Sequence, residues 1–202
     1  MSTPNADILI ERFHKRQYAE VERLARQQLA QSPGDPVLWN LLAASVAAQG
    51  RNAEALELKR AVVDRFPDNA SAHNNLGNAL VQCGQHVQAE AAFRQAIALE
   101  PGHANAHFQL GLALYQQHRL PEAWRQWQGF ADQAPQDVRF LVGASQALLH
   151  IPQELEAGLA WFAARLPEPL LQTQPALRQN LGALYMRAHR AGQAEQQFRA
   201  IV

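Results

Sequence analysis

Histidines are the side chains of this sequence that could most readily bind a metal ion. Of the eight histidines, His73 and His107 lie at equivalent positions of two expected helices, and His103 lies four residues before His107. A metal site needs several ligands that converge on the ion at about 2 Å, usually with a carboxylate or thiolate among them. The spacing of these histidines supplies no such partner. We therefore expect packing rings with a polar edge, and we predict no metal site and no cofactor.

The other groups that could act in catalysis form no recognisable pattern either. The single cysteine, Cys83, has no CxxC partner and no flanking cation that would make its thiol reactive. Four glutamates recur near the starts of expected helices, where a carboxylate interacts favourably with the helix dipole: Glu54, Glu90, Glu122 and Glu195. No spacing suggests a nucleophile with its base, and no glycine-rich phosphate loop is present. We predict that this chain has no catalytic residues and is not an enzyme.

Amide side chains are the polar groups with the clearest order. Along residues 70–83, polar side chains recur at intervals of three and four residues, so they share one face of a helix. A solvated helix face is the simpler interpretation, but such faces usually carry Glu and Lys. Each amide both donates and accepts hydrogen bonds, so it can pair with a peptide backbone. The predicted peptide-binding groove contains Asn40, Ser71, Asn74, Asn75, Asn78, Gln82, Asn105, Phe108, Gln109, Gln116 and Arg139.

Composition limits the possible partners. The 202 residues include 18 basic and 18 acidic side chains, so no net charge attracts nucleic acid or an anionic membrane. No window approaches eighteen apolar residues, and the N-terminal residues do not resemble a secretion signal. We therefore expect a cytoplasmic protein whose partner is a protein or peptide, with no nucleic acid and no membrane.

Positioning such a groove requires helices, and a 34-residue repeat predicts them. Four prolines keep this spacing, as do three alanines and three leucines: Pro33, Pro67, Pro101 and Pro135; Ala55, Ala89 and Ala123; Leu42, Leu76 and Leu110. First helices are expected near 5–14, 36–49, 70–83, 104–117, 138–150 and 175–188. Second helices are expected near 18–31, 53–66, 87–100, 121–133, 154–165 and 191–202.

Short-range signals mark the ends of these helices. Asp35 and Asp137 are expected to be N-caps, while Gly50 and Gly84 suit the left-handed position after a first helix. Pro152 interrupts the corresponding turn of the fifth unit, and residues 167–175 lengthen its exit by three residues. We expect the fifth unit to depart from the others.

The repeat resembles the tetratricopeptide repeat family, whose pattern is an aromatic residue, Leu-Gly, a second aromatic, Ala-x3-Phe and a closing Pro. The best-matched unit carries His73, Leu76, Gly77, Ala89, Phe93 and Pro101. The resemblance implies an all-α, right-handed α-solenoid of about six units that binds a peptide in its concave groove. A single array over 1–202 would contain units at about 2–35, 36–69, 70–103, 104–137, 138–174 and 175–202, the first degenerate and the last truncated.

Two subgroups of this family suggest more specific roles. One subgroup grips C-terminal carboxylates, but Asn74, Gln109 and Gly143 replace the cation or asparagine expected there, so we do not expect that clamp. Segments 73–78, 94–99 and 180–182 resemble repeats of bacterial proteins and of O-linked N-acetylglucosamine transferases, which hold substrates with an asparagine ladder. The alternative function is therefore a substrate-recruiting module of a larger enzyme, most plausibly a glycosyltransferase.

The last expected helix exposes an apolar face. Ala194, Phe198 and Ile201 occupy its core positions, yet no closing proline or polar capping helix follows them. We expect that the natural protein continues beyond Val202. We also expect self-association through this end, or a frayed last helix.

Overall fold

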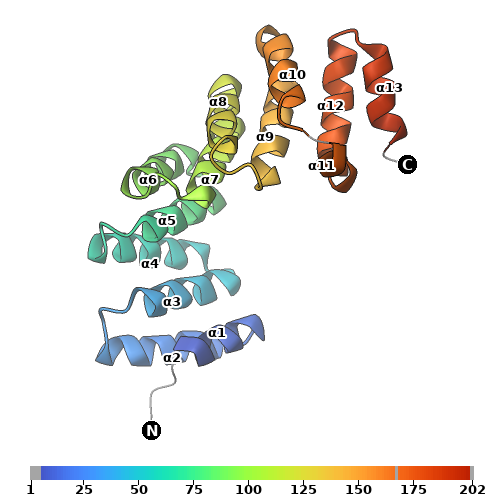
Figure 1. Cartoon of the computed structure of the whole chain (residues 1–202). Helices are drawn as coiled ribbons and strands as arrows, with labels where there is room; N and C mark the ends of the chain where they lie inside the picture. Colours follow the sequence, from blue (N-terminus) through green and yellow to red (C-terminus); the bar gives the residue numbers. More distant parts are fainter. Residues whose placement is uncertain (1–5, 167, 201–202) are drawn as a thin grey trace. The chain divides into compact units, whose positions relative to one another are not determined.

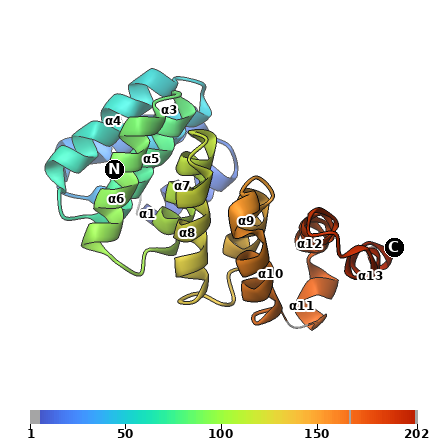
Figure 2. The ribbon, with the colours of Figure 1, turned by 90° about the horizontal axis from the view of Figure 1, so that it is seen from above.

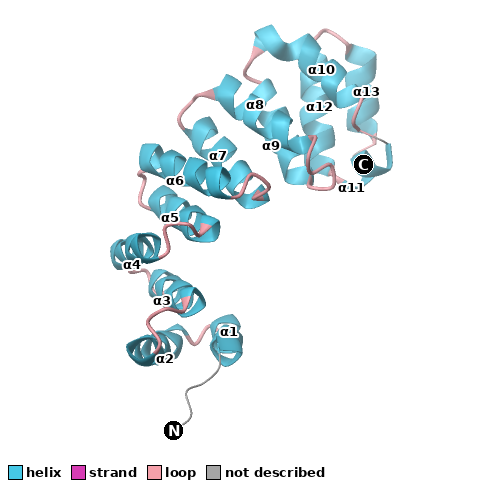
Figure 3. Ribbon diagram, turned by 60° about the vertical axis from the view of Figure 1, so that its left-hand side comes forward, coloured by secondary structure: helices cyan, strands magenta, loops and turns pink. Residues whose placement is uncertain are grey.

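Helices form every regular element that the structure describes. The computed structural model describes residues 6–166 and 168–200, and these divide into two compact units, 1–106 and 107–202. The cyan helices of Figure 3 are joined by short loops. Among the described helices, none combines the length and apolarity needed to cross a membrane. The chain therefore has the all-α solenoid fold that the sequence predicted.

The first unit is built from pairs of antiparallel helices (Figure 1). Its helix α3 packs against both α2 and α4, and α5 packs against both α4 and α6. This arrangement places α3, α4 and α5 around a common space. The helices are α1 (Ala6–His14), α2 (Tyr18–Gln31), α3 (Pro36–Ala48), α4 (Asn52–Arg65), α5 (Ala70–Gln82) and α6 (His86–Leu99).

The second unit continues the pattern with one irregular pair. Helix α7 (Ala104–Gln116) spans the boundary, with residues 104–106 in the first unit. It is followed by α8 (Leu120–Ala131), α9 (Val138–Leu148), the 3-10 turn η1 (Pro152–Glu154), α10 (Leu155–Ala163), α11 (Glu168–Thr173), α12 (Pro175–Arg187) and α13 (Ala191–Arg199). Helix α9 packs against α8 and α12, and α12 packs against α13. Figure 2 shows α12 and α13 end-on beside one another.

For the predicted helices up to residue 188, each helix end that the structure describes lies within two residues of its predicted position. Ile201, part of the predicted last helix, lies outside the described residues, as do residues 2–5 of the first predicted unit. Helix α11 was not predicted. Self-association through the C-terminal end stays a prediction; in the structure Ala194 is buried, while Phe198 is partly exposed.

The turn within every described helix pair except α9–α10 uses one left-handed residue. Arg16, Gly50, Gly84 and His118 have φ between 58° and 82° and recur with the period of the repeat, and His189 has φ of 56°. Glycine adopts this conformation without strain, which confirms the expectation for Gly50 and Gly84. Pro152 occupies the same place in the fifth unit but cannot reach positive φ. Its turn becomes the 3-10 turn η1 instead.

Replacing His118 by glycine is expected to raise the free energy of unfolding by about 1 kcal/mol, because a side chain in the left-handed region is strained. The reverse change, Gly84→Ala, should lower it by about the same amount. Urea unfolding followed by circular dichroism measures both. As a control, Gly102→Ala should have little effect, because Gly102 has neither positive φ nor a close neighbour. A stability loss in His118→Gly would contradict the strain argument.

The first helices start at capping residues with the same 34-residue spacing. The Asp35 carboxylate accepts from the Val37 N–H at 2.8 Å, and the Asn69 side chain accepts from Ala72 at 3.0 Å. Nδ1 of His103 accepts from the Ala106 N–H at 3.2 Å, and Asp137 accepts from the N–H of Arg139. The predicted caps Asp35 and Asp137 are therefore confirmed. Asp137 also pairs with the Arg139 side chain.

Glycines in first helices allow large rings from second helices to pack closely. A Cβ atom added at Gly77 would lie 2.4 Å from the ring of Phe93. The corresponding distances are 2.2 Å from Gly111 to Trp127 and 2.5 Å from Gly182 to Phe198. The separation of glycine and ring along the sequence is the same in all three pairs. These pairs hold the two helices of a repeat together.

Candidate functional site

The predicted polar stripe on α5 presents its residues unequally. Ser71 and Gln82 are exposed, and Asn75 and Asn78 are half-buried. Asn74 is only 7% exposed, and its Oδ1 is buried without a hydrogen-bond partner among the described residues. A helical spacing identifies residues of one face but not which of them a neighbour covers. Asn75, Asn78 and Gln82 are therefore the best placed to meet a ligand.

These three amides line one cavity of about 270 Å³. Its walls are Ala43, Ala44 and Ala47 of α3, Ala55 and Lys59 of α4, and Asn75, Asn78, Ala79 and Gln82 of α5. All of these residues belong to the first unit. The cavity thus combines small apolar walls with amides on one side, and we call it the α3–α5 cavity.

Lys59 also lines this cavity, although the sequence did not predict it there. Its Nζ donates to Oδ1 of Asn40 at 3.0 Å, and Nδ2 of Asn75 donates to the same oxygen at 3.1 Å. The predicted site residues Asn40 and Asn75 are therefore brought together by a shared acceptor. Burial of Lys59 lowers the pKa of its ammonium group to about 8, because desolvation disfavours the charged form.

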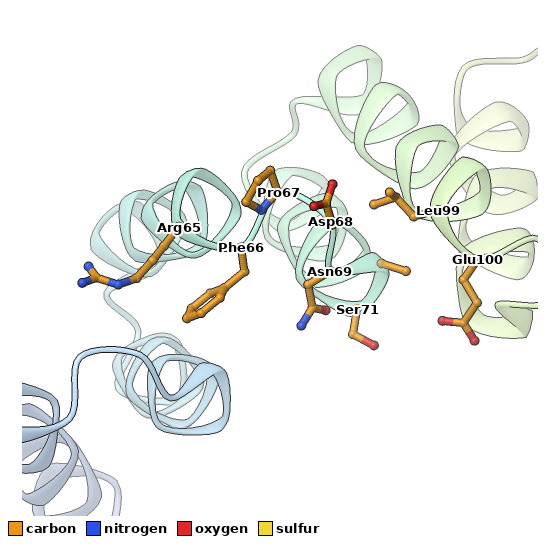
Figure 4. Close-up of a pocket in the computed structure, with 9 residues that line it drawn as sticks. Arg65, Phe66, Pro67, Asp68, Asn69, Ser71, Leu99 and Glu100 are labelled. Atoms are coloured by element: carbon orange, nitrogen blue, oxygen red, sulfur yellow. The ribbon is translucent and has the colours of Figure 1, made fainter.

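A second hollow of about 660 Å³ lies at the loops of the first unit (Figure 4). It is lined by the end of α4, the loop before α5, and the end of α6, including Arg65, Asn69, Ser71 and Glu100. The Asn69 side chain caps α5, and the Arg65 guanidinium lies over the Trp39 ring. Ser71 is the single predicted groove residue on its lining. Asn75, Asn78 and Gln82 do not line this hollow.

The predicted residues of the second unit form a separate group. The Arg139 guanidinium lies 5.2 Å from the centre of the Phe108 ring and pairs with the Asp137 carboxylate at 2.6 Å. The hydrogen bond from Arg139 holds the pKa of Asp137 below its usual range, although desolvation opposes this. Gln109 is half-buried and Gln116 is exposed. Asn105, which is exposed, belongs to the first unit.

The histidines considered as metal ligands take part in packing and capping. Nε2 of His73 lies 2.8 Å from the carbonyl oxygen of Pro67, which accepts a hydrogen bond. The His107 ring stacks on Phe130 with centres 4.1 Å apart, and His103 caps α7. Within the described ranges, no group of three His, Cys, Asp or Glu side chains could hold a metal ion. The absence of metal binding stays a prediction for experiment.

Solved structures show where this architecture recurs. YrrB, described as a TPR protein with an unusual peptide-binding site, is 16% identical with a TM-score of 0.70, covering 88% of this chain and 90% of its own. MamA residues 41 to the end from Desulfovibrio magneticus RS-1 are 20% identical with a TM-score of 0.69, covering 82% and 92%. Pseudomonas aeruginosa PilF is 19% identical with a TM-score of 0.64, covering 82% and 74%. At these identities the likeness concerns the fold.

The fold and its recurring turns, caps and glycine–ring pairs define a helical-repeat solenoid protein. A family model described as the tetratricopeptide repeat matches residues 46–93. A second model, described as the TPR repeat, matches residues 77–117. Residues 46–117 therefore match tetratricopeptide repeats. No curated protein matches the sequence.

Proposed function

We propose that the first unit binds an extended peptide segment of a partner protein along α5, at the α3–α5 cavity. The observation that carries this proposal is the gathering of Asn75, Asn78 and Gln82 at one cavity with alanine walls. Amides there can donate to and accept from the backbone of an extended chain, while the alanines leave space for a side chain. The protein thereby acts as an interaction scaffold.

Three observations support this choice. The family whose models match residues 46–117 is built from repeats that stack into extended binding surfaces. YrrB, which shares the fold, is described as having a peptide-binding site. The residues of this cavity also provide no nucleophile with an adjacent base, which an acyl- or glycosyl-transfer site would require.

Replacing Asn78 and Gln82 together by alanine is expected to weaken peptide binding by about 30-fold, if each lost hydrogen bond contributes about 1 kcal/mol. Both side chains line the cavity. Fluorescence polarisation with labelled nonapeptide pools measures the change. Binding should depend only weakly on salt, because a neutral amide contributes no counter-ion release.

The matched control is the double variant Gln88→Ala and Gln95→Ala. Both glutamines are exposed on α6 and do not line the cavity. This variant should bind the pools as the wild type does. Equal affinities for the control and for the Asn78 and Gln82 double variant would place peptide binding elsewhere, and binding to none of the pools would refute the proposal.

A further inference from the structure

The position of Lys59 in the repeat explains why the α3–α5 cavity exists. In the register of the repeat, Lys59 corresponds to Phe93 and Trp127, whose rings pack against Gly77 and Gly111. In this repeat Ala43 replaces the glycine, and the thinner lysine chain replaces the ring. Space that a ring fills in the neighbouring repeats is open here, which accounts for the cavity of about 270 Å³. This volume is several times the roughly 30 Å³ that one water molecule occupies in the liquid. The cavity therefore has room for one amino-acid side chain.

Lys59 brings a charge to this space without an internal counter-ion. The side chain is 9% exposed, and its ammonium group has one described hydrogen bond, to Asn40. Within the part of the chain that the structure describes, no carboxylate forms an ion pair with Lys59. By contrast, Lys15, the other lysine, is exposed and pairs with Glu11 at 2.6 Å. An ammonium group has three donors, so Lys59 keeps donors for a ligand.

The chemistry of the surroundings favours a carboxylate as that ligand. A buried ammonium ion is stabilised most by an anion that accepts its hydrogen bonds. A phosphate group is less suited, because phosphate sites usually combine several cations, with arginine prominent among them. Here the lining contains one cation and no arginine.

We propose that the α3–α5 cavity binds the side-chain carboxylate of an acidic residue in a partner peptide, with Lys59 as its counter-ion. This specificity rests on the peptide binding proposed above. This site differs from one that binds a C-terminal carboxylate through residues of first helices. Lys59 belongs to α4, the second helix of its pair. An incoming Asp or Glu completes an ion pair for which the protein supplies the cation alone.

Labelled peptide pools test this specificity directly. Three pools of C-terminally amidated nonapeptides differ only in their central residue, which is Glu, Gln or phosphoserine. The other positions of each peptide are mixtures of Ala, Ser, Val and Leu. A further pool has a central Gln and a free C-terminal carboxylate. Wild-type protein should bind the Glu pool at least about 10-fold more tightly than the Gln pool, the range expected for a hydrogen bond to a charged group. Lys59→Met should abolish this preference while still binding both pools.

The outcomes separate this inference from the proposed function. Equal binding of the Glu and Gln pools by the wild type would refute the carboxylate site while leaving peptide binding intact. Tighter binding of the phosphoserine pool, or a Lys59-dependent preference for the free C-terminus alone, would show that the wrong ligand was inferred. The Asn78 and Gln82 double variant should weaken both amidated pools and keep the Glu preference.

A probe without a peptide decides the remaining case, in which no pool binds. In protein labelled with ¹³C-lysine only Lys15 and Lys59 give signals. Sodium acetate should shift the Lys59 ε-methylene signal saturably and raise the pKa of Lys59, with sodium chloride at equal ionic strength as the control. The Lys15 signal should not move in the same way. Acetate binding without peptide binding would support the site and refute its proposed use, whereas the absence of both would refute both.

Discussion

Replacing Gly111 by alanine is expected to lower the free energy of unfolding by about 3 kcal/mol, the upper part of the usual range for overpacked cores. The new Cβ would lie 2.2 Å from Nε1 of Trp127, so one of the two helices must move. The indole cannot simply turn away. Its Nε1 donates to the Phe108 carbonyl oxygen at 3.1 Å, and its other side lies against Gly143 of α9. Urea unfolding followed by circular dichroism measures the loss.

The same substitution at Gly129 provides a matched control. Gly129 lies within α8, is exposed and has no neighbour within 4 Å of an added Cβ. Gly129→Ala should therefore stabilise the protein by about 0.5 to 1 kcal/mol, because alanine is the better helix former. Removing the indole in Trp127→Leu should relieve much of the clash, so the Gly111→Ala change should be less harmful in that background. Additive losses would contradict the proposed contact.

Lys59→Met is expected to raise the free energy of unfolding by about 3 kcal/mol at about pH 7, because it removes a buried charge. The difference between the ordinary lysine pKa of 10.5 and about 8 in the native protein underlies this magnitude. Asn40 keeps its hydrogen bond from Asn75 in the variant. Urea unfolding of both proteins over a series of pH values measures the difference.

The sign of the pH dependence follows from which state binds the proton. Below about pH 8 both native and unfolded Lys59 are charged, so burial destabilises the wild type fully. Between about 8 and 10.5 the native state releases the proton first, so wild-type stability rises with pH relative to Lys59→Met. The advantage of the variant should shrink over this range. A constant advantage, or one that grows with pH, would show that Lys59 is not desolvated in the native state.

Helix positions were predictable because their signals are local and repeat. Caps such as Asp35 and left-handed residues such as Gly50 fix the ends of a helix within its own few residues. Helix α11 was missed because the prolines of residues 167–175 indicated a loop. Proline is tolerated in the first turn of a helix, however, and buried Leu171 anchors α11 to the core.

The candidate site was predictable in part for a different reason. Helical spacing correctly placed Asn75, Asn78 and Gln82 on one face of α5, and the cavity collects these three. It could not show that Asn74 is buried, since coverage depends on the neighbouring helices. Lys59 was missed although the repeat aligns it with Phe93. Comparison with Phe93 and Trp127, at the same repeat position, would have shown that Lys59 replaces an aromatic ring. The resemblance to glycosyltransferase repeats stays a prediction.

Glycine–ring matching has a consequence for how such proteins can diversify. The partners come from the two helices of one pair, as Gly77 with Phe93 and Ala43 with Lys59 show. Recombination in the loop after a second helix would exchange whole pairs and keep the match within each pair, but contacts between pairs, such as Trp127 against Gly143, would still have to fit. A crossover in the turn between the two helices would combine Ala43 with a ring such as that of Phe93, whose atoms come within 2.4 Å of a Cβ placed at Gly77. The helix pair is therefore the smallest segment whose exchange keeps these glycine–ring matches together.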